Sequence, residues 1–133
     1  MEQSPFLGIQ AGIRVWVAGH GLAARRMVEE QLSGLSVARP KDGPIDVAVI
    51  VPKTVDEAVY FAGKVLNRLV RSGTVWILGL AGQSGLDAES LAQSPEWLNS
   101  EAGRRLVLTG QVTISPQCAA SGFRLREAGA TTG

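Results

Sequence analysis

The sequence predicts an α/β protein: a three-layer, Rossmann-like sandwich with a mostly parallel sheet and an antiparallel hairpin at its C-terminal edge. Three observations support this class. Short apolar runs rich in β-branched residues alternate with helical patterns, which is typical of a sheet covered by helices. The run TVWILGL (residues 74–80) is apolar at consecutive positions, as expected for a strand buried on both faces. The last two strand-like runs lie only a few residues apart, which favours an antiparallel pair.

Composition predicts one globular domain. Of 133 residues, 45% are hydrophobic and 19% are charged, which is enough apolar material for one core. We expect a single domain over residues 1–127 and a flexible polar tail over 128–133. The formal net charge of +1 provides no strong field to attract nucleic acid or an anionic membrane.

The same statistics predict a cytoplasmic protein. No stretch approaches the ~20 apolar residues that a membrane helix requires, and the N-terminal residues lack the pattern of a signal peptide. The single cysteine, Cys118, cannot form an internal disulfide, as is typical of a reducing compartment.

The first half of the chain predicts strands at residues 12–18 and 45–51, with a helix over 21–33 between them. The side chains available for the buried face of this helix are Leu22, Met27, Val28 and Leu32. Residues 35–39 (LSVAR) form either a short strand at the sheet edge or no strand. If they form a strand, only about six residues connect it to the parallel strand at 45–51. A connection of that length can barely span the distance back along the sheet.

The motif TVDE predicts a helix start, because Thr54 can cap the first turn while Glu57 reaches back to the amide of Thr54. We expect this helix to continue to Ser72 and Gly73. The apolar positions that support it are Val55, Ala58, Val59, Ala62, Val65, Leu66 and Leu69.

The second half predicts a helix that begins at Ser94 and Pro95 and runs to about Gly103. Strands are expected at residues 105–114 and 121–127. The three tryptophans stand in apolar surroundings and are expected in the core; they are Trp16, Trp76 and Trp97.

The first candidate site is the stretch between the first strand and the first helix. Gly19, Gly21 and Ala24 match the G-x-G-x-x-A fingerprint of dinucleotide-binding turns, in which free amides at the helix start meet phosphate. Arg25 and Arg26 lie near that helix start, where their charge opposes the helix dipole and suits an anion. The competing interpretation is a tight turn that requires glycine, and we favour it because so short a motif often occurs by chance.

Other polar residues predict no catalytic constellation and no metal site. His20 is the only histidine, and we expect a capping or solvent-facing role for it. Ser84 and Asp87 follow the strand at residues 74–80, at the edge where open α/β sheets bind ligands; they suit either a ligand or a turn, with the turn favoured. Cys118 is expected to be a small, partly buried residue.

Four segments together resemble a family of short bacterial domains of unknown function, over nearly the whole chain. They read GIQAGIRVWVAG, PIDVAVIVPKTVDEA, LVRSGTVWILGLAGQSGLD and SGFRLRE. Members of that family continue the tryptophan-containing strand into a Pro-Lys pair, where this chain has LGLAG at residues 78–82. The resemblance therefore implies no role for that lysine here, and it brings no established activity.

The pattern is also similar to the distal half of a class I methyltransferase. That resemblance implies the strand order 2-1-3-4-6-5, numbering the six expected strands along the chain. The stretch VAGHGLA is shorter than the glycine-rich loop of such enzymes, and no acidic residue ends the segment 35–39 to hold a ribose. We therefore do not expect methyl transfer.

These observations predict a non-catalytic domain that acts by binding a protein partner or by self-association. The alternative is a degenerate nucleotide- or phosphoanion-binding module that uses the Gly19–His20–Gly21 turn. The alternative implies a small phosphorylated ligand, and neither interpretation identifies a cofactor. No nucleic-acid or membrane partner is expected.

Overall fold

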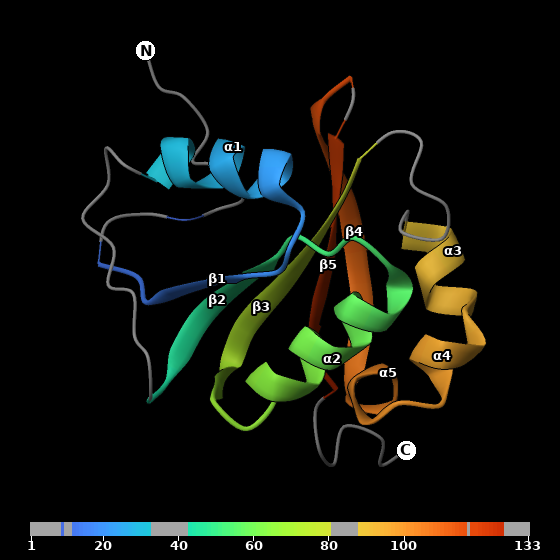
Figure 1. Cartoon of the computed structure of the whole chain (residues 1–133). Helices are drawn as coiled ribbons and strands as arrows, with labels where there is room; N and C mark the ends of the chain where they lie inside the picture. The colour runs from blue at the N-terminus through green and yellow to red at the C-terminus, as the bar shows by residue number, and fades with distance from the viewer. Residues whose placement is uncertain (1–8, 10–11, 33–42, 81–87, 117, 127–133) are drawn as a thin grey trace.

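The computed structural model describes residues 9, 12–32, 43–80, 88–116 and 118–126. In this part of the chain a five-stranded sheet is flanked by helices (Figure 1). The elements in chain order are β1 (Val15–Ala18), α1 (Leu22–Leu32), β2 (Ile45–Ile50), α2 (Val55–Val65), β3 (Leu69–Leu80), α3 (Ala88–Gln93), α4 (Pro95–Leu98), α5 (Glu101–Arg105), β4 (Leu106–Ser115) and β5 (Cys118–Leu125). No helix among the described residues is long and apolar enough to cross a membrane.

The sheet has the order β1-β2-β3-β5-β4. The β1–β2 and β2–β3 pairs are parallel, whereas β5 runs antiparallel to both β3 and β4. The predicted class is therefore confirmed, including the antiparallel C-terminal hairpin. The order also matches the predicted 2-1-3-4-6-5 once the strand at residues 35–39 is omitted, because that segment lies outside the described residues.

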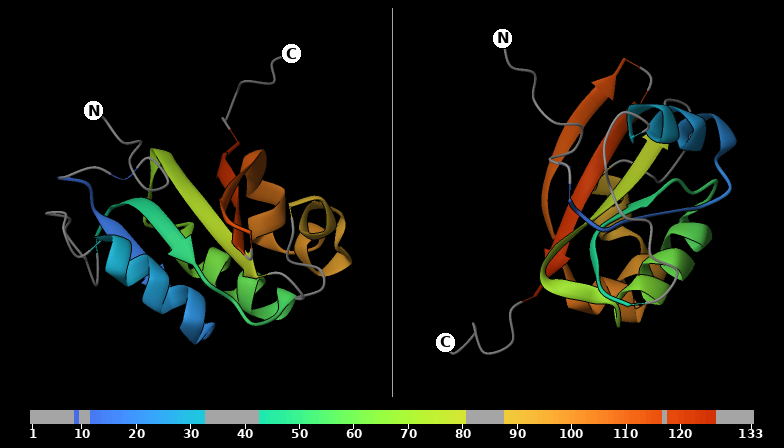
Figure 2. Two further views of the ribbon diagram at one scale, coloured as in Figure 1. Left: turned by 90° about the horizontal axis from the view of Figure 1, so that it is seen from above. Right: turned by 90° about the vertical axis from the view of Figure 1, so that its left-hand side faces the viewer.

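Two apolar cores lie on opposite faces of the sheet, as the alternation of side chains along each strand requires. On one face, Val28 and Leu32 of α1 pack against Val47 and Val49 of β2. On the other face, β2 contributes Ala48 and Ile50 to a core with the helices α2 to α5. Figure 2 shows α1 separated from the group of α3, α4 and α5, which lies beside the β4–β5 hairpin.

Leu22 was expected to be buried, but its side chain is 75% exposed. The physical reason is helical geometry. Leu22 precedes the buried Val28 by six residues, so the two side chains point about 120° apart around the helix at ~100° per residue. An apolar side chain is therefore exposed at the first position of α1.

The second helix ends earlier than predicted. Its cap at Thr54 is present, but α2 ends at Val65, and β3 already begins at Leu69. Leu69 pairs with Ile45 at the start of β2. Apolar residues at positions 65, 66 and 69 fit two structures: one face of a longer helix, or the end of a helix followed by a buried strand. The pairing of Leu69 with β2 makes the second one correct.

The predicted helix from Pro95 to Gly103 is divided into α4 and α5. Ser100 interrupts it by capping the second helix, accepting a hydrogen bond of 2.9 Å from the amide of Gly103. Trp97 is buried as predicted. A side chain at Gly103 would collide with the carbonyl oxygen of Trp97, so this glycine permits the close turn.

Candidate functional site

The β1–α1 loop and the β2–α2 loop lie side by side at the carboxyl ends of the two parallel strands. The amide of Val51 donates to the carbonyl of Ala18 at 2.8 Å, which continues the β1–β2 pairing beyond Ile50. The amide of Gly21 then donates to the carbonyl of Val51, also at 2.8 Å. Because ligands of open α/β sheets bind at this edge, the two joined loops form the candidate site.

The glycines of the first loop serve this junction. Gly19 has φ +122°, and a Cβ there would lie 2.7 Å from the carbonyl carbon of Val51 and closer still to its oxygen. A Cβ on Gly21 would lie 2.9 Å from the same oxygen and 3.3 Å from the carbonyl oxygen of Pro52. Both glycines are required because backbone approaches backbone, which is the turn interpretation of this motif.

The basic residues of α1 divide into two kinds. Arg25 is bound to its own surroundings: its Nη1 donates to the carbonyl of Gly19 at 3.1 Å, and its Nε lies 3.3 Å from Glu29. Arg25 thereby closes the loop onto the first turn of the helix. Arg26 is exposed on the helix surface.

Glu57 joins the second loop to the first. As predicted, Thr54 caps α2 by accepting a hydrogen bond of 3.2 Å from the amide of Glu57. The carboxylate does not return to the amide of Thr54, however. Its Oε1 accepts from the amide of Lys53 at 3.1 Å and, more weakly, from the amide of His20 at 3.4 Å. The capping glutamate therefore has a long-range partner, which local sequence patterns do not predict.

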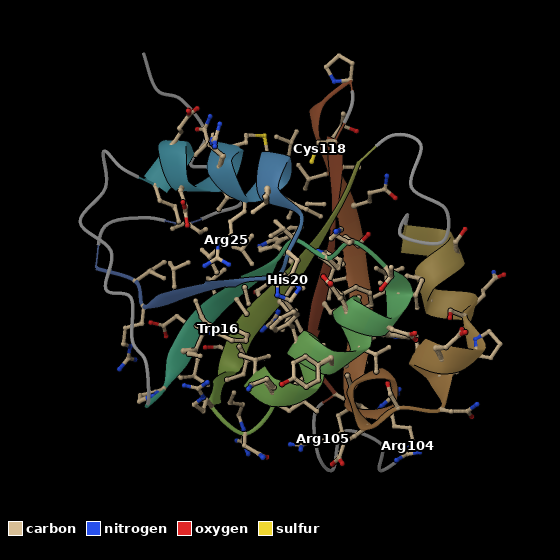
Figure 3. All side chains as sticks on the ribbon, viewed as in Figure 1. Trp16, His20, Arg25, Arg104, Arg105 and Cys118 are labelled. Carbon is tan, nitrogen blue, oxygen red and sulfur yellow. The ribbon has the colours of Figure 1, made fainter. Side chains whose placement is uncertain are left out.

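His20 and Glu57 form a side-chain pair. The imidazole Nδ1 lies 2.9 Å from Oε2 of Glu57, and the ring meets Phe61 edge-on at a centroid distance of 5.7 Å. Burial alone would raise the pKa of Glu57, but hydrogen bonds from His20 and Lys53 outweigh it, so this pKa is lowered. Glu57 is therefore ionised at neutral pH. Figure 3 shows His20 between the start of α1 and α2.

Three other residues considered in the sequence analysis are Ser84, Asp87 and Cys118. Ser84 and Asp87 are outside the described residues. Cys118 begins β5 opposite Leu80 and is buried, and burial raises the pKa of its thiol, so it is suited to packing rather than to nucleophilic chemistry.

At the amino ends of β1 and β2, opposite to the loops of the candidate site, an ion pair joins the two strands. The amide and the Nε of Arg14 both donate to Oδ2 of Asp46, at 3.0 and 3.2 Å. The backbone hydrogen bond from Arg14 is the main reason that the pKa of Asp46 is lowered. This pair connects neighbouring strands and lies away from the loops of the candidate site.

No protein-family model matches the sequence, and no curated protein matches it either. Solved structures do share its fold. A SAM-dependent methyltransferase from Aquifex aeolicus aligns with a TM-score of 0.54 and 13% identity, covering 90% of this chain and 85% of that one. LepI in complex with SAH and a substrate analogue gives 0.51 and 9%, covering 86% and 44%. The Methanococcus jannaschii fibrillarin pre-rRNA processing protein gives 0.50 and 13%, covering 84% and 56%.

The chain thus has a Rossmann-like fold of the methyltransferase type. This finding corrects the expectation of a non-catalytic domain, because the structures that share the fold include a SAM-dependent methyltransferase. Partner binding and self-association stay expectations. The phosphoanion alternative is corrected as well, since the amides of His20 and Gly21 are already hydrogen-bonded within the protein. The resemblance to a family of short bacterial domains stays an expectation.

Proposed function

We propose that this chain is a methyltransferase-type domain that binds S-adenosylmethionine, and its product S-adenosylhomocysteine, at the carboxyl ends of β1 and β2. The observation that carries the proposal is the fold: the chain aligns over 90% of its length with a SAM-dependent methyltransferase, which it covers to 85%. The joined loops lie at the edge of the sheet where such folds accept ligands.

The residues at this edge suit a ligand of this kind. S-adenosylmethionine presents an ammonium group, ribose hydroxyls and an apolar adenine ring. An ionised carboxylate has about four acceptor positions. Glu57 uses three of them within the protein, and its side chain is 24% exposed, so it has capacity for one further donor from a ligand. Leu22, 75% exposed beside the loop, offers apolar surface to an aromatic ring.

When bound, the sulfonium group supplies an activated methyl group. The protein's own contribution is to hold the ligand at the two loops and to orient it. The hydrogen bonds of Gly21 and Glu57 make this surface rigid before the ligand arrives, which reduces the entropy lost on binding.

Isothermal titration calorimetry with S-adenosylhomocysteine tests the proposal. We expect saturable binding to one site. At a hundredfold excess over the dissociation constant, the ligand should raise the free energy of unfolding by about 2.7 kcal/mol. Glu57→Gln should weaken binding about tenfold, since it removes the charge from the ligand-facing acceptor. Asp56→Asn, the same change at the preceding exposed residue of α2, should leave the affinity unchanged. Absence of binding at millimolar ligand would contradict the proposal.

A further inference from the structure

The pair formed by His20 and Glu57 has a geometry that the binding role does not require. The chain contains one histidine, and it stands in the loop at the carboxyl end of β1. Its Nδ1 lies 2.9 Å from Oε2 of Glu57, across 37 residues of sequence. A packing contact would be satisfied by any polar residue here, whereas an imidazole beside a carboxylate also has proton-transfer chemistry.

The tautomer of His20 follows from its partner. An ionised carboxylate only accepts hydrogen bonds, so Nδ1 is the atom that carries the proton in this contact. In the neutral imidazole the lone pair is then on Nε2. No described residue forms a hydrogen bond with Nε2, and the His20 side chain is 68% exposed. The base therefore faces outward, beside the proposed ligand site.

Both members of the pair are held in place. The carboxylate of Glu57 is fixed by the amides of His20 and Lys53, and the imidazole ring lies edge-on to Phe61, one helical turn beyond Glu57. The same two loops carry two basic residues: Arg25, whose guanidinium is bound to the carbonyl of Gly19, and Lys53, whose backbone amide is bound to Glu57. A base oriented through its second nitrogen by a carboxylate is the arrangement by which proteins remove a proton from a hydroxyl group.

We propose that His20, positioned by Glu57, accepts the proton of a hydroxyl-bearing methyl acceptor at Nε2. This inference rests on the proposed function. As the acceptor oxygen bonds to the methyl carbon, the carbon–sulfur electron pair stays on sulfur and the hydroxyl proton passes to Nε2. The resulting imidazolium is stabilised by the carboxylate of Glu57. His20 is then a catalytic residue, and Glu57 is a positioning residue.

The single histidine makes the test direct, because its two ring nitrogens give an unambiguous ¹H–¹⁵N spectrum of the 133-residue chain. We expect the neutral ring to be protonated at Nδ1. Glu57→Ala should shift the population toward the Nε2-protonated form, and Asp56→Ala, its neighbour on α2, should not. A wild-type ring protonated at Nε2, or a tautomer that Glu57→Ala leaves unchanged in a folded protein, would overturn the proposal.

A second measurement tests the ligand side with phenol as the hydroxyl probe. Adding phenol to protein saturated with S-adenosylhomocysteine should move the ¹⁵N signal of Nε2, since the hydroxyl donates to that atom. An unmoved signal would overturn the proposal. With S-adenosylmethionine, His20→Gln should slow methylation of phenol by about 10²–10⁴-fold, and an equal rate in both proteins would also overturn it. If S-adenosylhomocysteine fails to bind while Nδ1 is protonated as expected, the proposed function fails and the His20–Glu57 pairing stands.

Discussion

Replacing Gly19 by alanine tests the idea that the glycines join two loops of the protein. The new Cβ would lie 2.7 Å from the carbonyl carbon and 2.9 Å from the amide nitrogen of Val51. The backbone at Gly19 also has φ +122°, which L residues rarely adopt. Strain at such a position costs about 1–3 kcal/mol, and overpacking against fixed backbone atoms adds about 1–3 kcal/mol. We expect Gly19→Ala to lower the free energy of unfolding by about 2–6 kcal/mol, a large part of the ~5–15 kcal/mol typical of a domain.

Gly43→Ala is the matched control for this substitution. Gly43 has φ +100°, but a Cβ there meets nothing within 4 Å, so only the backbone strain applies. Urea denaturation of the two variants, at equal slopes, gives the difference between their unfolding free energies. We expect Gly19→Ala to be the less stable by at least about 1 kcal/mol. Equal losses would contradict this prediction, because the collision with Val51 would then contribute nothing to the instability.

Three further predictions concern stability and are measured by the same urea titrations. Gly63→Ala should raise the unfolding free energy by about 0.5–1 kcal/mol, because the position is helical and a Cβ there meets nothing within 4 Å; a loss would contradict it. Thr54→Ala should cost about 1 kcal/mol by removing the cap on the amide of Glu57, and Thr54→Ser should restore most of it. The pKa of Asp46 is lowered on folding, so its pairing with Arg14 stabilises the protein at pH values above the ordinary pKa of 3.8. This stabilisation is lost as the pH falls through the lower pKa of the folded state. Asp46→Asn should therefore cost up to about 1 kcal/mol at pH 7 and less at about pH 3, and a cost independent of pH would contradict this.

Local patterns were sufficient to predict most of the fold. The strand at β2, the cap at Thr54 and the C-terminal hairpin each depend on neighbours within a few residues, and all three are present. The end of α2 could not be predicted in this way. Leu69 continues the helical spacing, but its pairing with Ile45, which lies far away in sequence, places it in a strand.

The candidate site was harder to predict because its contacts are long-range. The sequence indicates that the stretch from Gly19 to Gly21 needs glycine. It does not show that a Cβ on either glycine would collide with the backbone of Val51. It likewise assigns Glu57 to a local capping box. The carboxylate instead binds His20, 37 residues away, and only the parallel pairing of β1 and β2 brings the two loops together. A glutamate at a helix start directly after a buried strand was the available signal for this role.

Mapping the amide resonances that S-adenosylhomocysteine perturbs is the most direct test of the proposed methyltransferase-type site. We expect the largest changes at residues 18–22 and 50–57, in the two loops at the carboxyl ends of β1 and β2. Arg14 and Asp46, at the amino ends of the same strands, should be unaffected. Saturating changes centred on Arg14 and Asp46, or no changes at millimolar ligand in a folded protein, would contradict it.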